Sequence, residues 1–337
     1  MAFQQDGNGV VGGSWDNTVR KWAVIDGEQI GKAIKVGSTV RSVAVSKDGG
    51  WIVCGGDSGL VTICNGSMHE KVIEVKGHTF GVLAVDVSPN SKMFATGSYD
   101  ETAVIWDIPA GEKLIGPLRH EGQVSGVNFS PDGDRLATAT WDDSAIRVFD
   151  SHSGELLIHI PDSVHSVHST PIAWSNDGLH IFSAYSGKIK QLDVLTGSML
   201  SVWTVHGEHN FASIALAHHG KFIAYSTAKP GLVSLWDTVT HSRIGPVIQH
   251  SGEVSSIALS PDGNWLAAGQ YNNRITFRDL TDILPHSFVN SSSTPFPQKS
   301  PLDTMEVRDP VVEESRSTQD IISPTSGPLV RYLVDYH

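Results

Sequence analysis

The sequence contains few cysteines and no long apolar run. Its 337 residues include only Cys54 and Cys64, and two cysteines cannot build a framework of disulfide bonds. No apolar run approaches the roughly 18 residues that cross a bilayer, and the first ten residues lack the basic and apolar regions of a secretory signal. We therefore expect a soluble protein of a reducing compartment, cytoplasmic or nuclear, with no membrane contact.

Positive charge is also scarce. The chain has 24 lysines and arginines against 36 aspartates and glutamates, a formal charge of −12, and no basic cluster is longer than two residues. Such a surface repels a phosphate backbone, so nucleic acid is not an expected partner. Only 18% of the residues are charged while glycine is abundant at 33, which favours many short strands and tight turns over long helices.

A turn of the type Ser-Pro-Asp-Gly recurs along the chain with a period of about 42 residues. Each copy has short runs in which apolar and other residues alternate, so it forms three or four antiparallel strands. One such sheet cannot bury both of its faces, and stacking the copies around an axis predicts a seven-bladed β-propeller. The third turn position falls at Asp6, Asp48, Asn90, Asp132, Asp177, His219 and Asp262, in steps of 42, 42, 42, 45, 42 and 43.

A second marker, a residue near the end of the third strand, keeps step with the turn. It falls at Trp22, Cys64, Trp106, Phe149, Leu192, Trp236 and Arg278. The copy KGHTFGVLAVDVSPNSKMFATGSYDETAVIWD (76–107) and its successor (119–150) resemble the WD40 repeat family. The stretches 111–133 and 242–263 resemble WD repeats of fungal proteins, including those with an upstream NACHT NTPase domain. That likeness implies an all-β propeller that holds other proteins, and either a further domain upstream in the same polypeptide or a free-standing relative of such proteins.

The resemblance also implies a buried hydrogen-bonded set in each blade, made of a histidine, a hydroxyl residue, an aspartate and a tryptophan. In the best copy these match His78, Ser98, Asp100 and Trp106, and in the next copy His120, Thr140 and Asp142, with phenylalanine in place of tryptophan. The other copies are degenerate. Blades with Cys64, Leu192 or Arg278 at the tryptophan position must depend on apolar packing, and we expect them to be softer.

The two ends of the chain depart from the repeat. Met1 aligns inside a first strand, so residues 1–284 form a propeller whose N-terminal blade is expected to be incomplete. Either an upstream segment is missing or the ring closes differently. Residues 285–337 are rich in Ser, Pro and Thr and are expected to be a largely disordered tail. Its apolar end, 329–336, is either a short docking strand or helix or an unstructured terminus.

One loop position carries an aromatic residue in five blades. In the resembled family this position opens on the top face around the central channel, and the residues are Trp15, Tyr99, Trp141, Tyr185 and Tyr271. Exposed aromatic side chains on a rigid scaffold supply contact area at a low entropic cost, so the sequence predicts a protein- or peptide-binding face. The alternative is that some of them pack between blades.

Signals for catalysis or metal binding are weak. The chain has 16 histidines, but the pairs His165 with His168, His206 with His209 and His218 with His219 lack a recognisable zinc or iron spacing. No nucleophile elbow, paired-carboxylate motif or phosphate-binding loop is found. We expect no catalytic residues, metal or cofactor, and a scaffold for protein interactions that acts as a sensing or signalling module.

Two alternatives remain open. A propeller enzyme would need carboxylates or histidines that converge on the channel from the innermost strands, and the stretches 43–45 and 257–259 are apolar and small. A reader of histone tails or chromatin would be compatible with the acidic charge and would bind basic peptides on the top face.

Overall fold

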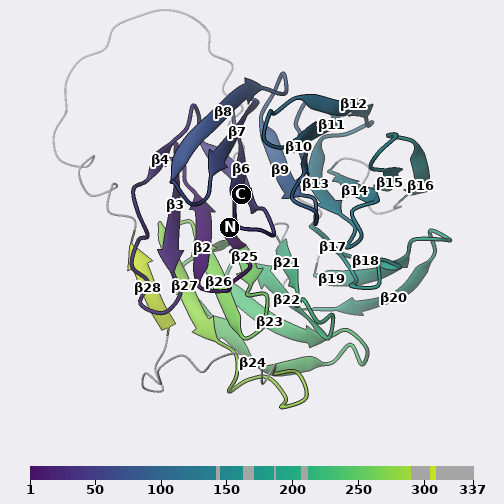
Figure 1. Cartoon of the computed structure of the whole chain (residues 1–337). Helices are drawn as coiled ribbons and strands as arrows, with labels where there is room; N and C mark the ends of the chain where they lie inside the picture. The colour runs from purple at the N-terminus through teal and green to yellow at the C-terminus, as the bar shows by residue number, and fades with distance from the viewer. Residues whose placement is uncertain (142–144, 162–170, 186, 206–211, 290–303, 309–337) are drawn as a thin grey trace, which may run out of the picture.

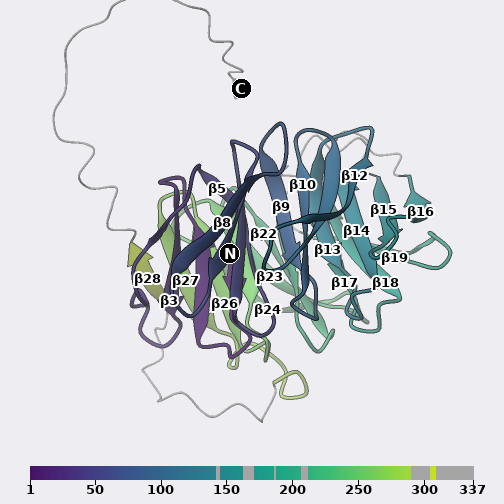
Figure 2. The same cartoon turned by 45° about the horizontal axis from the view of Figure 1, so that its top comes forward.

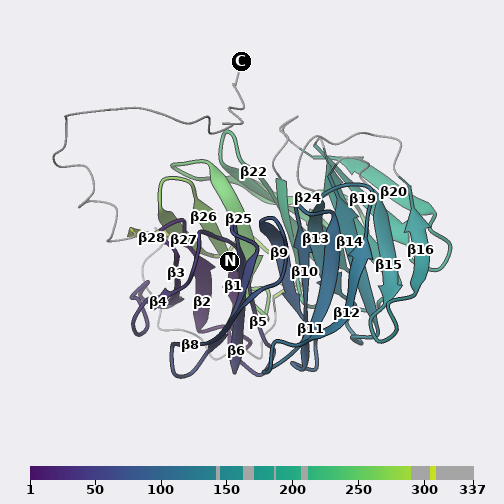
Figure 3. The same ribbon diagram turned by 90° about the horizontal axis from the view of Figure 1, so that it is seen from above.

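The chain forms a ring of seven sheets around a central axis, as Figure 1 shows for the computed structural model. The structure describes residues 1–141, 145–161, 171–185, 187–205, 212–289 and 304–308. Each sheet has four antiparallel strands in sequential order, so the predicted seven-bladed all-β propeller is confirmed. The tilted views in Figures 2 and 3 show the strands running roughly along the axis of the disc. No helix in the described part of the chain is long and apolar enough to cross a membrane.

The blades follow one another along the chain. Blade one contains β1 (Ala2–Phe3), β2 (Gly9–Gly13), β3 (Thr18–Ala23) and β4 (Ile34–Lys35). Blade two contains β5 (Val40–Val45), β6 (Trp51–Gly56), β7 (Leu60–Asn65) and β8 (Glu70–Lys76). Blade three contains β9 (Val82–Val87), β10 (Met93–Ser98), β11 (Thr102–Asp107) and β12 (Lys113–Arg119). Blade four contains β13 (Val124–Phe129), β14 (Arg135–Thr140), β15 (Ile146–Asp150) and β16 (Leu156–Ile160).

The remaining three blades repeat this plan. Blade five contains β17 (Ile172–Trp174), β18 (His180–Tyr185), β19 (Lys188–Asp193) and β20 (Met199–Thr204). Blade six contains β21 (Ala212–Leu216), β22 (Phe222–Thr227), β23 (Leu232–Asp237) and β24 (Arg243–Gln249). Blade seven contains β25 (Val254–Leu259), β26 (Trp265–Gln270), β27 (Arg274–Asp279) and β28 (Thr304–Arg308).

The recurring turn joins the first strand of each blade to the second. In blade four the Asp132 carboxylate accepts a hydrogen bond from the backbone N–H of Asp134 at 3.1 Å, which closes the turn. Gly133 follows with a φ of 83°, a left-handed conformation that glycine adopts without a steric cost. The turn therefore sets the pairing of Phe129 with Leu136 and the register of the hairpin.

The apolar core lies between neighbouring blades. Val53 and Val61 of blade two pack in one cluster with Val82, Phe94 and Trp106 of blade three. Full burial of a side chain such as Phe94 stabilises the fold by about 2 kcal/mol relative to exposure. Each blade thus buries its faces against the next one, as the stacking argument requires.

Polar contacts also join the innermost strands around the channel. The backbone N–H of Val85 donates to Ser42 Oγ of the preceding blade at 3.1 Å. One step further round, the N–H of Phe129 donates to Asp86 at 2.7 Å. These bonds hold neighbouring blades in register at the axis.

The end of the chain returns to blade seven. Segment 280–289 packs against the core of blades six and seven, and Phe288 stacks on Phe222 with ring centroids 6.4 Å apart. Residues 304–308 then form β28, which pairs with β27 as the outer strand of blade seven. This strand lies within the tail that the sequence predicts to be largely disordered. It was not predicted, because an edge strand draws its stability from backbone hydrogen bonds to its neighbour, which composition does not reveal. Positions 290–303 and 309–337, including the apolar end 329–336, lie outside the described residues.

Blade one, whose completeness the sequence left in question, has four strands in the structure. Two of them, β1 and β4, contain only two residues each. The Met1 amino group lies 3.4 Å from Ser256 Oγ of blade seven, and Phe3 packs in a cluster with Ala267 and Phe277 of that blade. Blades one and seven are therefore in direct contact.

Candidate functional site

The polar set of blade three is fully assembled around a threonine. His78 Nε2 lies 2.7 Å from Thr96 Oγ1, and Trp106 Nε1 donates to the same oxygen at 2.9 Å. His78 Nδ1 lies 3.0 Å from a carboxylate oxygen of Asp100. The structure thus brings together His78, Asp100 and Trp106, but the hydroxyl that joins them belongs to Thr96. The expectation that Ser98 fills this place is corrected.

Ser98 has a different task, in the turn that follows. Its Oγ donates to the carbonyl of Gly81 at 2.9 Å and accepts the N–H of Asp100 at 3.1 Å. Asp100 also accepts the N–H of Thr79 at 2.9 Å. Ser98 and Asp100 therefore tie the turn between β10 and β11 to the loop that precedes β9.

The protonation states of blade three follow from these contacts. Burial lowers the pKa of His78, and the charge of Asp100 offsets this only in part. Burial raises the pKa of Asp100, but the hydrogen bond from Thr102 and the interaction with His78 outweigh it, so the net pKa is low. A neutral imidazole then donates from Nδ1 to an ionised Asp100 and accepts the Thr96 hydroxyl proton at Nε2, while Thr96 accepts from Trp106.

Blade four repeats part of this arrangement. His120 Nε2 lies 2.8 Å from Thr138 Oγ1, two residues before the predicted Thr140. Thr140 instead donates to a backbone carbonyl at 3.2 Å. Phe149 replaces the tryptophan and meets the imidazole edge to face at 5.6 Å, so the indole donor is absent here. Asp142 lies outside the described residues.

Blade one replaces the absent histidine with an arginine. Arg20 Nη2 lies 2.6 Å from Asp16, and its side chain is only 2% exposed. Burial raises the pKa of Asp16, but hydrogen bonds from Thr18 and Arg20 outweigh this and keep the carboxyl ionised. Sequence reasoning missed Arg20. The available signal was a charged residue at a strand position that is apolar, Val104, in blade three.

The five aromatic loop residues do not form one continuous ring. Trp15 is 71% exposed and Tyr271 is 50% exposed, and their rings meet edge to face at 6.1 Å across the junction of blades one and seven. Tyr99 and Trp141 are half-buried and form a second edge-to-face pair at 5.4 Å between blades three and four. Tyr185 is buried, with the Lys190 ammonium 4.0 Å from its ring centroid. Four of the five residues therefore reach the surface, as two pairs.

Blade two separates the two pairs with charged groups. The Arg41 guanidinium lies 5.6 Å from the ring centroid of Tyr99 and donates a hydrogen bond to Asp57, which occupies the aromatic position in this blade. Phe80, in the loop before β9, adds a further exposed ring. Sequence reasoning missed these three residues, because they lie outside the aromatic pattern. We call Trp15, Tyr271, Tyr99, Trp141 and Phe80 the top-face aromatics.

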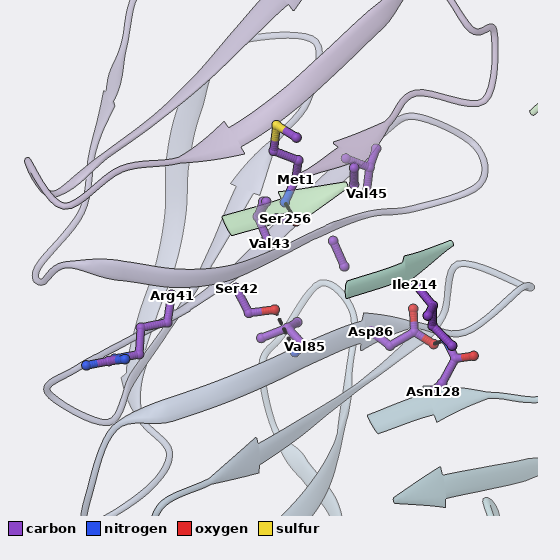
Figure 4. A pocket seen from close by; sticks show the side chains of 12 residues that line it. Met1, Arg41, Ser42, Val43, Val45, Val85, Asp86, Asn128, Ile214 and Ser256 are labelled. Atoms are coloured by element: carbon purple, nitrogen blue, oxygen red, sulfur yellow. Dashed lines mark hydrogen bonds between the residues drawn. The ribbon is translucent and has the colours of Figure 1, made fainter. Parts of the chain in front are cut away.

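The central channel holds a cavity of about 360 Å³, shown in Figure 4. Asp86 projects into it beside Asn128, whose amide donates to the carboxylate at 3.0 Å. Burial raises the pKa of Asp86 to about 6, although hydrogen bonds from Phe129 N–H and Asn128 oppose the change. The equivalent repeat position is Asn128 itself in blade four and alanine in the other five blades, at Ala2, Ala44, Ala173, Ala215 and Ala258.

The cavity walls around Asp86 are formed largely by alanine, valine and serine. The other polar groups in the lining are Asn128, Arg41 and the Met1 amino group, whose pKa burial lowers to about 6. Among the described residues no three His, Cys, Asp or Glu side chains gather as metal ligands. His165, His168, His206 and His209 lie outside the described residues, while His218 and His219 occupy the turn before β22.

Comparisons with known proteins agree with this architecture. The family model described as "WD domain, G-beta repeat" matches residues 1–23, 31–65, 69–107, 112–150 and 242–279, together more than half of the chain. The chain is 36% identical to a guanine nucleotide-binding protein subunit beta of Oryza sativa subsp. japonica, over 59% of this chain and 44% of that protein. It is 22% identical to autophagy-related protein 16 of Arabidopsis thaliana, over 88% and 50%.

Two further likenesses have wide coverage of this chain. The B-type cell cycle switch protein ccs52B of Medicago truncatula is 26% identical over 77% of this chain and 52% of that protein. A solved chain of Kuenenia stuttgartiensis hydrazine synthase superposes with a TM-score of 0.73 at 16% identity, over 83% of this chain and 94% of that one, which shows a shared fold. The chain spans about half the length of the curated relatives it matches.

Proposed function

The chain belongs to the WD40 repeat family, and we propose that it is a non-catalytic scaffold that binds other proteins through the top-face aromatics. The observation that carries the proposal is the pair of Trp15 and Tyr271, which expose 71% and 50% of their surfaces on neighbouring blades. Large rings on rigid turns lose little conformational entropy on binding, and such rings dominate interface energies.

The wider surroundings of this pair support the same proposal. A guanine nucleotide-binding protein subunit beta is, by its name, one part of an assembly. Among the described residues no three potential metal ligands gather, so a metal-dependent propeller enzyme gains no support from them. A reader of basic tails is favoured by one observation, the charge of −12, and is a more specific form of the same binding function.

We further propose that the propeller is the sensing end of a longer signalling protein, similar to the fungal proteins with an upstream NACHT domain. The support is the resemblance of stretches 111–133 and 242–263, together with the partial coverage of the relatives. Both cysteines are free thiols and buried, which supports a location in a reducing compartment, the cytoplasm or the nucleus.

The test is a selection of peptides from a random phage-displayed library on the whole chain, followed by calorimetric titration of the recovered peptides. We expect Trp15→Ala and Tyr271→Ala each to weaken binding by about tenfold or more, as for interface hot spots. The matched control is Val239→Ala, a side chain 82% exposed in the turn after β23, and it should leave affinity unchanged. Equal affinities of Trp15→Ala and the unmodified chain would contradict the proposal. Enrichment of lysine- and arginine-rich peptides would favour the tail reader.

A further inference from the structure

We propose that the propeller has a second interaction surface on its rim, where the outer strand β20 of blade five accepts an extended apolar strand of a partner protein. Figure 1 places β16 and β20 on the outside of the ring, at blades four and five. In the sheet of blade five, β20 pairs with β19, and no other strand of the described part of the chain pairs with its outer edge, so this edge presents backbone donors and acceptors. Such an edge is a template for another strand.

The other outer strands carry features that discourage strand addition. Strand β8 has four charged side chains, and β12 and β24 each contain a proline and a charged residue. Strand β4 has two residues, and β28 contains a glutamate and an arginine. These are the usual protections of a sheet edge. By contrast, β16 reads LLIHI and β20 reads MLSVWT, with no proline, lysine, arginine or carboxylate in either.

Exposed apolar side chains are numerous on the same two blades. Of the described large apolar residues that are well exposed, about half lie on blades four and five. Leu156 and Leu157 lie on β16, Met199, Leu200 and Val202 lie on β20, and Leu179 and Leu195 lie in turns. Apolar side chains clustered on one part of a surface mark an interaction site, whereas single ones need no explanation. The rim of blades four and five therefore combines an open backbone edge with an apolar surface.

The two faces of β20 differ in what covers them. Trp203 stacks on His241 of blade six at 4.2 Å, so the face of Trp203 is covered on that side. Leu200 and Val202 point to the opposite face because side chains alternate along a strand. They remain 51% and 45% exposed. A strand added outside β20 would extend this face and cover both.

The occupant is inferred from charge. Two copies of a chain with a charge of −12 repel each other, which opposes pairing of β20 with its own copy. The complementary partner is an extended segment with alternating apolar side chains and basic flanking residues.

The experiment uses the peptide KKVTVTVKK, labelled with fluorescein, and the whole chain. We expect saturable binding by fluorescence anisotropy, with hydrogen-exchange protection of the β20 amides. Leu200→Lys should weaken binding by about tenfold, because a gatekeeper charge on an edge blocks strand addition. Leu114→Lys on β12 is the matched control, since Leu114 is also 51% exposed and second in its strand, and it should change affinity less than about twofold.

Three results would overturn the proposal. The first is an absence of binding, and the second is an equal loss of affinity in Leu200→Lys and Leu114→Lys. The third is a dimer in sedimentation equilibrium that Leu200→Lys dissociates, which would assign the rim to a second copy. A peptide with N-methylated alternate residues should not bind if backbone pairing is the mode. Trp15→Ala should leave this binding intact, so failure here is distinguishable from failure of the top-face proposal.

Discussion

Blades three and five have the same four-stranded architecture but differ in what fills them. In blade three, Thr96 accepts from Trp106 and meets His78, so a polar chain crosses the interior. In blade five the equivalent positions hold Ser183 and Leu192, so the buried hydroxyl is kept but the indole donor is lost, and Phe182 on the opposite face of the strand meets Trp203 edge to face at 6.4 Å. The sheet order is the same in both blades.

The comparison shows that a blade of this propeller can be filled without the complete set of histidine, threonine, aspartate and tryptophan. The repeat requires alternation, a tight turn and an apolar contact with the next blade, and both interiors meet these needs. In a chain of buried hydrogen bonds, replacing one residue leaves its partners without a hydrogen bond, and each buried donor left in this way lowers the stability of the fold. An apolar interior carries no such dependence, and its losses follow buried volume.

The largest expected effect comes from breaking the polar chain at its shared atom. Thr96→Val removes the partner of two buried nitrogens, one on His78 and one on Trp106. At roughly 1–3 kcal/mol for each stranded group, we expect a loss of about 4 kcal/mol in the free energy of unfolding, measured by urea denaturation.

Blade four supplies the matched control for this change. Thr138→Val removes the hydrogen-bond partner of one nitrogen, Nε2 of His120, because Phe149 has no donor that would bond to the threonine. Its loss should be about half as large, roughly 2 kcal/mol. Equal losses in the two variants would mean that the indole contributes nothing to the set.

The second effect concerns the channel wall, where blade three has Asp86 and blade five has Ala173. The folded pKa of Asp86 is about 6, above the ordinary 3.8, so the folded state binds a proton that the unfolded state releases. Stability is therefore lost as pH rises from about 4 to about 6, by at most about 3 kcal/mol. Asp86→Asn should stabilise the chain at pH 8 and change it little below pH 4.

An aspartate with the opposite shift checks the sign of this result. Hydrogen bonds from the backbone N–H groups of Ser153 and His152 lower the pKa of Asp150, so its ionised form stabilises the fold above the unfolded pKa. Asp150→Asn should destabilise the chain at neutral pH. Urea titrations at pH 4, 6 and 8 separate the two variants, and stabilisation by Asp86→Asn that is the same at every pH would contradict the titration argument.

Much of the fold could be predicted because the turn chemistry repeats. A turn built on Ser130, Asp132 and Gly133 closes the same hairpin in nearly every copy, so its spacing alone located seven sheets. The resemblance to WD40 repeats located His78, Asp100 and Trp106. It could not separate Thr96 from Ser98, because residues two apart in a strand point to the same face.

Other features depend on contacts that the period does not encode. Strand β28 lies in a segment of low apolar content, and its order comes from the backbone of β27. Arg20 and Asp86 were visible as departures from apolar positions of the repeat, but their partners become evident only in three dimensions. Trp15, Tyr99, Trp141 and Tyr271 lie in loops, whereas Tyr185 is the last residue of β18 and is buried beside Lys190 of the neighbouring strand.

The smallest expected effect comes from Tyr185, where a substitution should change stability without changing peptide binding. Tyr185→Leu removes a ring lying 4.0 Å from the Lys190 ammonium, and we expect a loss of about 1 kcal/mol in unfolding free energy with no change in peptide affinity at the top face. Trp15→Ala should do the reverse, with stability changed by less than about 0.5 kcal/mol and affinity lost. Thermal unfolding and calorimetric titration of both variants measure the two quantities. If Tyr185→Leu lowered affinity as Trp15→Ala does, the buried ring would belong to the binding face and the two-pair description would be wrong.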